Sequence, residues 1–257
     1  PTLREDFFSI GKLIASFKNV NVLAFTTNGY KLKEIAERSR YSGFTNVNVS
    51  VDSLISSNFF SITGRNLLPN VLSGVYKSIA VGLCVKINVV LLRGFSIHDF
   101  DNFLDFVLYE NISIRFIELV GTKNSINFFL NNFISSLFLC NYLENHGWVK
   151  CSFEKNAGPA VVYSHKCYLG TVGFISSYSS NFCLFCNRLR ISAVGDFYLC
   201  LFGGKEKIYS IRKYLSFSEK PGVLKNVIQN IISYKDLSHF LLAGDFGAIT
   251  QLSQLGG

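Results

Sequence analysis

Apolar residues recur with two different spacings in the first half of the chain, and the two spacings alternate. Apolar residues three or four positions apart predict helices, whereas alternating or continuous apolar residues predict strands. The expected helices are Phe7–Phe17, Lys31–Ser42, Leu67–Val81 and Ile97–Tyr109. The expected strands are Val20–Gly29, Thr45–Ser53, Cys84–Leu92 and Ile112–Leu119. Four strand–helix alternations, with about thirty residues between successive strands, predict a parallel sheet covered by helices.

Polar side chains alternate with valine and isoleucine inside these strands. The polar positions are Thr26, Asn28, Asn48, Ser50, Asp52, Lys86, Asn88 and Arg115. A period of two usually means that one sheet face meets solvent. Here the helices should bury one face, and closure into a barrel would enclose the other. A polar lumen that holds a ligand is therefore the better interpretation, because barrel enzymes place their chemistry at the carboxyl ends of strands.

The second half of the chain has a different pattern. Short strands are expected at Trp148–Phe153, Pro159–His165 and Leu169–Ile175, and helices at Lys207–Leu215 and Gly222–Tyr234. Before them, Asn127–Leu143 reads as a loop and one buried helix, broken by asparagines and too polar to span a bilayer. We expect two domains, residues 1–147 and 148–257.

Composition narrows the range of partners and compartments. The formal charge of +8 favours an anionic partner such as a nucleotide, a nucleic acid or a membrane, although a lysine-rich composition would produce the same charge. Seven cysteines without a secretory signal predict reduced thiols or metal ligands, and a cytosolic or organelle-matrix protein. The chain has no methionine and starts directly in a helix, so we expect that its beginning is missing.

The segment FCLFCNRLRIS carries the clearest chemistry. Cys183 and Cys186 form a C-x-x-C pair, and Cys200 follows. This set supports either zinc, with Cys167 or His165 as a fourth ligand, or an iron–sulfur cluster with one open iron. Arg188 and Arg190 flank Leu189 and would project to the same side of an extended segment. Guanidinium groups suit phosphates, which a purely structural zinc site does not require.

Several segments together resemble one enzyme family. They are FTTNGY, VNVSVDSL, FSITGR, GLCVKINVVLLRG, IRFIEL and GFISSYSSNFCLFCNRLRISAVGDFYLCLF, with a terminal LGG. In order and spacing they are similar to the GTP 3′,8-cyclases, radical S-adenosylmethionine enzymes of molybdenum cofactor biosynthesis. The resemblance covers nearly the whole chain. It implies a partial (β/α) radical-SAM TIM-like barrel that lacks its first two strands, followed by a C-terminal iron–sulfur domain.

The resemblance also implies roles for single residues. Cys183, Cys186 and Cys200 match the ligands of a C-terminal 4Fe-4S cluster whose open iron meets the guanine base of GTP. The remaining matches are GTP contacts at Thr26, Lys86, Arg188, Leu189 and Arg190, S-adenosylmethionine contacts at Ser50 and Val120, and catalytic roles at Arg115, Gly256 and Gly257. Val120 stands where the family often has methionine, which a backbone contact would tolerate.

In this family a second, N-terminal 4Fe-4S cluster cleaves S-adenosylmethionine, and the 5′-deoxyadenosyl radical takes hydrogen from C3′ of GTP. The C3′ radical then closes onto C8. The ligands of that cluster form a C-x-x-x-C-x-x-C run, which this sequence lacks. We therefore expect a fragment, with the product of an eroded gene as the alternative, that cannot generate the radical alone. The expected partners are GTP and S-adenosylmethionine, with a homodimer left open and no nucleic acid or membrane partner. The cytoplasm, or the mitochondrial matrix in a eukaryote, is the expected compartment.

Two other interpretations compete with this one. A non-catalytic zinc module could bind RNA or a nucleotide through its basic surface, and would contain no acid-labile sulfide. A relative with the same architecture could instead modify a peptide, in which case the chain would not bind GTP.

Overall fold

Two compact units make up the protein. A computed structural model describes residues 1–94, 96–152, 159–179, 182–183, 186–215, 222–235, 241 and 247, with the backbone alone at 96–98. The first unit comprises Pro1–Leu119, Ile134–Ser152 and Ala160–Ile175, and we call it the sheet unit. The second comprises Val120–Phe133, Phe153–Pro159 and Ser176–Gly257, and we call it the cysteine unit.

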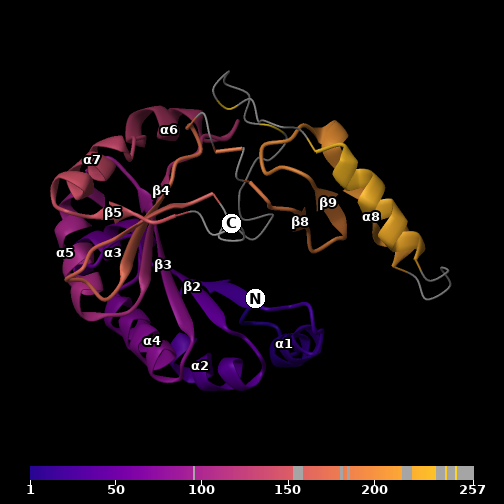
Figure 1. Ribbon diagram of the computed structural model, residues 1–257, viewed down its shortest axis with the longest axis horizontal. Helices are drawn as coiled ribbons and strands as arrows, with labels where there is room; N and C mark the ends of the chain where they lie inside the picture. Colours follow the sequence, from indigo (N-terminus) through magenta and orange to yellow (C-terminus); the bar gives the residue numbers. More distant parts are fainter. Residues whose placement is uncertain are drawn as a thin grey trace. The chain divides into compact units, whose positions relative to one another are not determined.

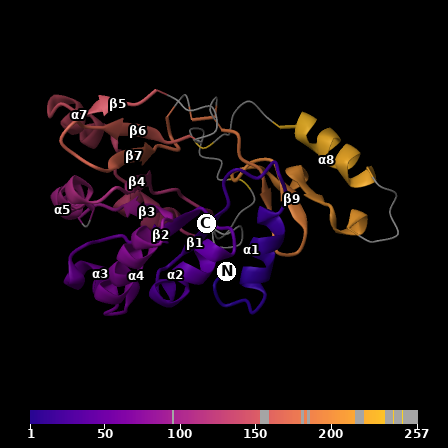
Figure 2. The same cartoon turned by 60° about the horizontal axis from the view of Figure 1, so that its bottom comes forward.

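A seven-stranded, mostly parallel sheet organises the sheet unit. Its strands lie in the order β1-β2-β3-β4-β7-β6-β5. Their bounds are β1 Ala24–Thr27, β2 Asn46–Ser50, β3 Cys84–Leu91, β4 Ser113–Glu118, β5 Val149–Lys150, β6 Val161–Ser164 and β7 Thr171–Ile175. The pairs from β1 to β4 and from β4 to β7 are parallel, and β6 and β5 extend the sheet in antiparallel pairing. In Figure 2, β4, β7, β6 and β5 follow one another across the sheet.

Helices cover one face of that sheet. They are α1 Phe7–Ala15, α2 Leu32–Tyr41, α3 Ser56–Thr63, α4 Leu68–Ala80, α5 Ser96–Tyr109 and α7 Leu137–Asn145. Helix α4 packs on β3, α5 packs on β3, β4 and β7, and α7 packs on β5. In Figure 1 α2, α4 and α5 follow the outer side of the curved sheet. The four predicted strand–helix alternations are thus confirmed, as is the partial α/β fold.

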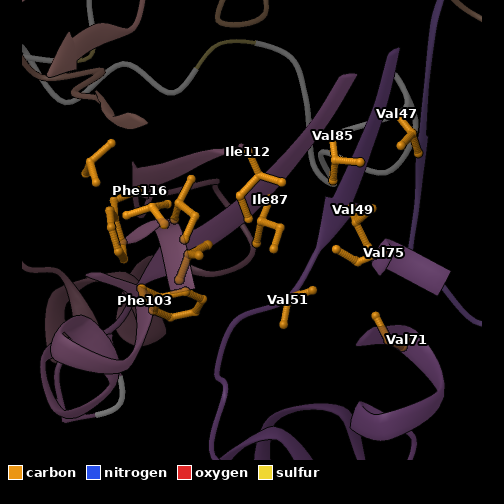
Figure 3. Packing of buried hydrophobic residues seen from close by; sticks show 14 of the residues in the cluster. Val47, Val49, Val51, Val71, Val75, Val85, Ile87, Phe103, Ile112 and Phe116 are labelled. Atoms are coloured by element: carbon orange, nitrogen blue, oxygen red, sulfur yellow. The ribbon is translucent and has the colours of Figure 1, made fainter. Parts of the chain in front are cut away.

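Apolar residues of the strands meet the helices on this covered face. Val47, Val49 and Ile87 are fully buried, and Val75 of α4 and Phe103 of α5 lie in the same cluster (Figure 3). Burying a side chain of this size contributes about 1.5–3 kcal/mol, so these contacts account for much of the unit's stability. The alternation seen in the sequence therefore decides which face of each strand is left for polar residues.

Helices α2 and α4 approach each other closely because a glycine lies between them. A Cβ atom on Gly74 of α4 would lie 2.8 Å from Cβ of Leu32 and 2.9 Å from the backbone nitrogen of Lys33. A side chain there would force the helices apart, and overpacking of this kind costs about 1–3 kcal/mol.

The described residues of the cysteine unit form a small antiparallel sheet, two helices and two 3₁₀ turns. Its elements are α6 Ile126–Asn132, β8 Arg190–Ile191, β9 Asp196–Tyr198, the 3₁₀ turn η1 Lys205–Lys207, β10 Ile208–Ser210, the 3₁₀ turn η2 Arg212–Tyr214 and α8 Val223–Ser233. The three strands pair in the order β10-β9-β8. A second core is formed by Ile231 of α8 together with Phe197, Leu199 and Ile211. Figure 2 shows α8 beside β9.

Two predicted helices are wrong. The stretch Asn127–Leu143 forms two helices, α6 and α7. The first ends at Asn132, whose side-chain amide donates to the carbonyl oxygen of Phe128 at 2.9 Å, and the backbone of Phe133 is extended. Helix α6 also buries no residue. Residues 207–215 contain β10 between two 3₁₀ turns, because Ile208–Ser210 pairs with β9. Helix α3 was not predicted, whereas the helix expected at Gly222–Tyr234 is confirmed as α8.

The expected domain boundary at residue 147 does not coincide with a division between the two units. Strands β5, β6 and β7 join the large sheet, so most of residues 148–175 belong to the sheet unit. Conversely, Val120–Phe133 belongs to the cysteine unit.

Within the part of the chain that the structure describes, no helix combines the length and the apolarity needed to cross a membrane.

Candidate functional site

Strand register brings the polar residues of the sheet unit into rows across neighbouring strands. In the first row Thr26 of β1 is level with Asn48 of β2, and Asn48 is level with Lys86 of β3. Asn48 donates from Nδ2 to Oγ1 of Thr26 at 3.3 Å, which ties the two side chains together on one face. All three residues are half-buried, whereas their neighbours Val47 and Val49 are fully buried on the opposite face.

A second row lies two residues further along the strands. Ser50, Asn88 and Arg115 are level with one another on β2, β3 and β4, and Gly173 of β7 ends the row. The glycine has no side chain, and a Cβ atom there would lie 3.7 Å from Cγ of Arg115, at van der Waals contact distance. The Oδ1 atom of Asn88 is buried and has no hydrogen-bond partner among the described residues. Buried polar atoms are normally satisfied, so Asn88 supports the interpretation of this face as a ligand site.

Asp52 lies two residues beyond the end of β2 and bonds to the neighbouring strand β3. Its Oδ1 atom accepts a hydrogen bond of 2.9 Å from the backbone N–H of Val90 in β3. Burial raises the pKa of the Asp52 carboxyl above its ordinary value, and the bond from Val90 opposes that rise. The carboxyl therefore holds its proton to a higher pH than an exposed aspartate does.

Glu118, at the end of β4, is a residue that the sequence did not single out. It is buried, and its Oε1 atom accepts hydrogen bonds from the backbone N–H of Ser136 at 2.8 Å and from its hydroxyl at 2.9 Å. A carboxylate at this position accepts the N–H of Ser136 at the start of α7 and is favoured by the positive end of the helix dipole. Glu118 thus fixes the end of the strand that leads to Val120.

Val120 begins the cysteine unit and is half-buried. The next residue, Gly121, donates its backbone N–H to the hydroxyl of Tyr178 at 3.3 Å. The Tyr178 ring in turn contacts the rings of Phe129 and Phe133. The backbone near Val120 is therefore held by residues of its own unit, independently of its side chain.

The three predicted ligand cysteines occupy two neighbouring segments of the cysteine unit. Cys183 and Cys186 lie on a turn in which the N–H of Cys186 donates to the carbonyl of Cys183 at 3.1 Å. Cys200 follows β9, and its sulfur accepts a hydrogen bond of 3.4 Å from the N–H of Phe202. The two segments meet because β8 pairs with β9, with Arg190 level with Tyr198.

Charges of neighbouring thiols and cations act on the pKa values of Cys200 and Arg190. Burial raises the pKa of the Cys200 thiol, the N–H of Phe202 lowers it, and the charges of Cys186 and Cys183 raise it further. Burial lowers the pKa of Arg190, the thiols of Cys186 and Cys200 raise it, and Arg188 lowers it. Arg190 is half-buried, whereas Arg188 and Leu189 are exposed.

The donor set fits an iron–sulfur cluster by its chemistry. It offers three soft thiolate ligands, an N–H group that donates to one sulfur, and nearby cations that compensate negative charge. As they stand, no three His, Cys, Asp or Glu side chains in the described ranges are arranged so that they could hold a metal ion. Metal binding would therefore draw the thiols closer together.

The fourth zinc ligands considered from the sequence, His165 and Cys167, belong to the sheet unit. The His165 ring packs against Trp148 and Tyr168, and its Nδ1 atom accepts a hydrogen bond of 3.2 Å from the backbone of Cys167. These contacts explain His165 as a packed residue. Gly256 and Gly257 lie outside the described residues.

Comparison with known proteins decides the family. Residues 112–241 match the family Molybdenum Cofactor Synthesis C. The GTP 3′,8-cyclase of Mannheimia succiniciproducens is 38% identical to the chain over 258 residues, which is 100% of this chain and 76% of that protein. The chain belongs to the GTP 3′,8-cyclase family. The family member of Haemophilus influenzae (strain 86-028NP) is also 38% identical, with 76% of it covered, and that of Klebsiella pneumoniae (strain 342) is 37% identical, with 78% covered.

Membership in the GTP 3′,8-cyclase family confirms the resemblance drawn from the sequence. The roles of single residues stay predictions. In the sheet unit, Thr26, Lys86, Ser50 and Arg115 lie in adjacent rows of one sheet. In the cysteine unit, the pairing of β8 with β9 brings the segments of Cys186 and Cys200 next to each other.

Asp52→Asn is expected to stabilise the sheet unit more at about pH 7 than at about pH 4. In the unfolded chain the carboxyl ionises near its ordinary pKa of 3.8, whereas burial raises its pKa in the folded chain. Stability is therefore lost as pH rises from the ordinary pKa through the raised one, by about 1.4 kcal/mol for each pH unit between them. The amide does not ionise and can still accept the hydrogen bond from Val90, so the variant escapes this loss.

Trp148, the single tryptophan, is buried in the same unit, so its fluorescence reports denaturant unfolding at both pH values. Asp101→Asn, on the exposed side of α5, removes the same charge and is the matched control. An Asp52→Asn effect that is the same at both pH values would contradict a raised pKa of the Asp52 carboxyl.

Proposed function

We propose that this chain carries the GTP- and S-adenosylmethionine-binding strands and the C-terminal cluster segment of a GTP 3′,8-cyclase. This activity converts GTP to (8S)-3′,8-cyclo-7,8-dihydroguanosine 5′-triphosphate. The observation that carries the proposal is the register of the sheet. It aligns Thr26 with Lys86 through Asn48, and Ser50 with Arg115 through Asn88, on the face that the covering helices do not bury.

The two rows support different tasks. Lys86 supplies a cation and Thr26 a hydroxyl in the first row, which suits a nucleotide phosphate and ribose. In the second row, the hydroxyl of Ser50 and the unsatisfied acceptor of Asn88 suit hydroxyl or amino groups, as S-adenosylmethionine offers. Arg115, level with Gly173, adds a fixed positive charge to the second row.

The cysteine unit contributes substrate binding and a cluster. Cys183, Cys186 and Cys200 would hold a 4Fe-4S cluster that leaves one iron open for the guanine base. Arg188 and Arg190 would bind GTP, and the backbone of Leu189 lies between them. Half-buried Arg190 is in a region of lowered dielectric, where its attraction for phosphate exceeds that of an exposed arginine.

The 5′-deoxyadenosyl radical of the family comes from S-adenosylmethionine at a second cluster, held by a C-x-x-x-C-x-x-C run. This sequence has no such run. The task of the residues present here is to bind GTP, orient its C3′ and C8 atoms toward each other and exclude water.

The first test is the metal content of the anaerobically purified and reconstituted chain. We expect iron and acid-labile sulfide in equal amounts, lost in Cys186→Ser because a thiolate ligand is removed. Cys167→Ser is the matched control and should keep its cluster, since this exposed thiol is not one of the three proposed ligands. Zinc without sulfide, lost in Cys167→Ser, would instead support the zinc-binding nucleotide or RNA module.

A second test measures GTP affinity by equilibrium dialysis. Lys86→Ala and Arg190→Ala should each weaken binding about tenfold to a hundredfold, because each removes a charge-assisted phosphate contact. Lys77→Ala and Arg65→Ala remove the same charges at exposed positions and should leave the affinity unchanged. If the unmodified chain does not bind GTP, the peptide-modifying alternative gains support.

The third test is S-adenosylmethionine cleavage by this chain alone, reconstituted with iron and sulfide and supplied with dithionite. No 5′-deoxyadenosine is expected above the level of a protein-free control, because the C-x-x-x-C-x-x-C ligands are absent from the sequence. Stoichiometric 5′-deoxyadenosine would refute this part of the proposal while leaving GTP binding intact.

A further inference from the structure

Lys235 links the two segments that carry the ligand cysteines. It comes two residues after the end of α8, and its side chain is half-buried. Its Nζ atom donates to the carbonyl oxygen of Arg188 at 2.9 Å and to that of Leu199 at 2.8 Å. Arg188 is two residues after Cys186, and Leu199 directly precedes Cys200. One ammonium group therefore joins backbone from both halves of the thiol set.

The bond pattern of the small sheet explains why such a link is needed. Strands β8 and β9 pair only through Arg190 with Tyr198 and Ile191 with Phe197. Beyond Arg190 the ladder stops, and the backbone that leads to Cys186 and Cys200 lies at its open end. A lysine has three donors on a compact head, so it can occupy this place and satisfy two carbonyl groups at once.

The helix that leads to Lys235, α8, is held in place by packing. Helix α8 contributes buried Ile231 and the partly buried Leu224, Val227 and Ile228 to the second core, against Phe197 and Leu199. Leu199 is thus fixed twice, through its side chain on α8 and through its carbonyl on Lys235.

We propose that Lys235 is a positioning residue for the cysteine set, which holds the Cys186 and Cys200 segments together and places a positive charge beside the cluster they bind. The inference rests on the proposed function, because it assumes that these thiolates bind an iron–sulfur cluster. A cation near a cluster favours its more negative, reduced form. Removing the cation therefore lowers the reduction potential, and removing the link loosens the ligands.

The test compares Lys235→Met and Lys235→Arg with the unmodified chain and with Lys225→Met, all reconstituted with iron and sulfide. Lys225 is exposed on α8, so this variant removes the same charge from the helix that precedes Lys235, without removing a hydrogen bond to the cysteine segments. The measurements are iron and sulfide per chain, the rate of iron loss to a chelator, and the one-electron midpoint potential of the cluster from a dye-mediated titration.

Lys235→Met is expected to lose iron several-fold faster than the unmodified chain and to have a lower midpoint potential. Lys235→Arg should recover most of both properties, because a guanidinium keeps the charge and can donate to two carbonyl groups. Lys225→Met should match the unmodified chain. A Lys235→Met cluster with unchanged potential and unchanged iron retention overturns the inference while leaving the proposed function intact.

Two further outcomes are decisive. If Lys235→Met takes up no cluster, Lys235→Arg decides: recovered uptake supports the inference, and equal failure counts against it. If the unmodified chain takes up no iron and sulfide, the proposed function itself fails, and the inference fails with it.

Discussion

The burial of every second residue in the parallel strands is the constraint on which the sheet unit depends. Val47 and Val49 can reach the helices only if Asn48 and Ser50 point to the other face, because successive side chains of a strand alternate. A slip of one residue would bury the polar set and expose the valines, at a cost of several side-chain burial energies. The same packing that stabilises the fold therefore presents the candidate ligand-binding residues.

Parallel pairing extends this constraint from one strand to the whole site. Each strand contributes only one or two polar side chains, and none of them is unusual alone. The in-register pairs Asn48 with Lys86 and Asn88 with Arg115 assemble them into rows across β2, β3 and β4. Glu118 and Asp52 then fix where two of the strands end, through hydrogen bonds to Ser136 and Val90. A rigid sheet holds a ligand with less entropy loss than mobile loops would.

The sequence predicted the features that depend on local periodicity. The alternation around Val47 and Ile87 identified the strands and their polar face, and the spacing of apolar residues identified α2, α4, α5 and α8. It failed where a distant partner decides the structure. Residues 208–210 look helical alone but pair with β9, and the helix at residues 127–143 ends because Asn132 bonds to Phe128. The domain boundary could not be predicted from the sequence either. Strand β7, which follows the expected boundary, pairs with β4, which precedes it.

Lys235 shows the same limit at the candidate metal site. The spacing of Cys183, Cys186 and Cys200 is visible in the sequence, but the ammonium that joins their segments comes from 36 residues beyond Leu199 and 47 beyond Arg188. Arginine and lysine have different tasks here, and their chemistry explains the difference. A planar guanidinium suits bidentate binding of phosphate, as proposed for Arg188 and Arg190, whereas a compact ammonium suits two carbonyl oxygens at an angle. Three thiolates held in one partly buried place, as the proposed cluster requires, would repel one another. The arginines proposed to bind substrate and the lysine that binds backbone would both reduce this repulsion, so a change to either would affect the stability of the proposed cluster site.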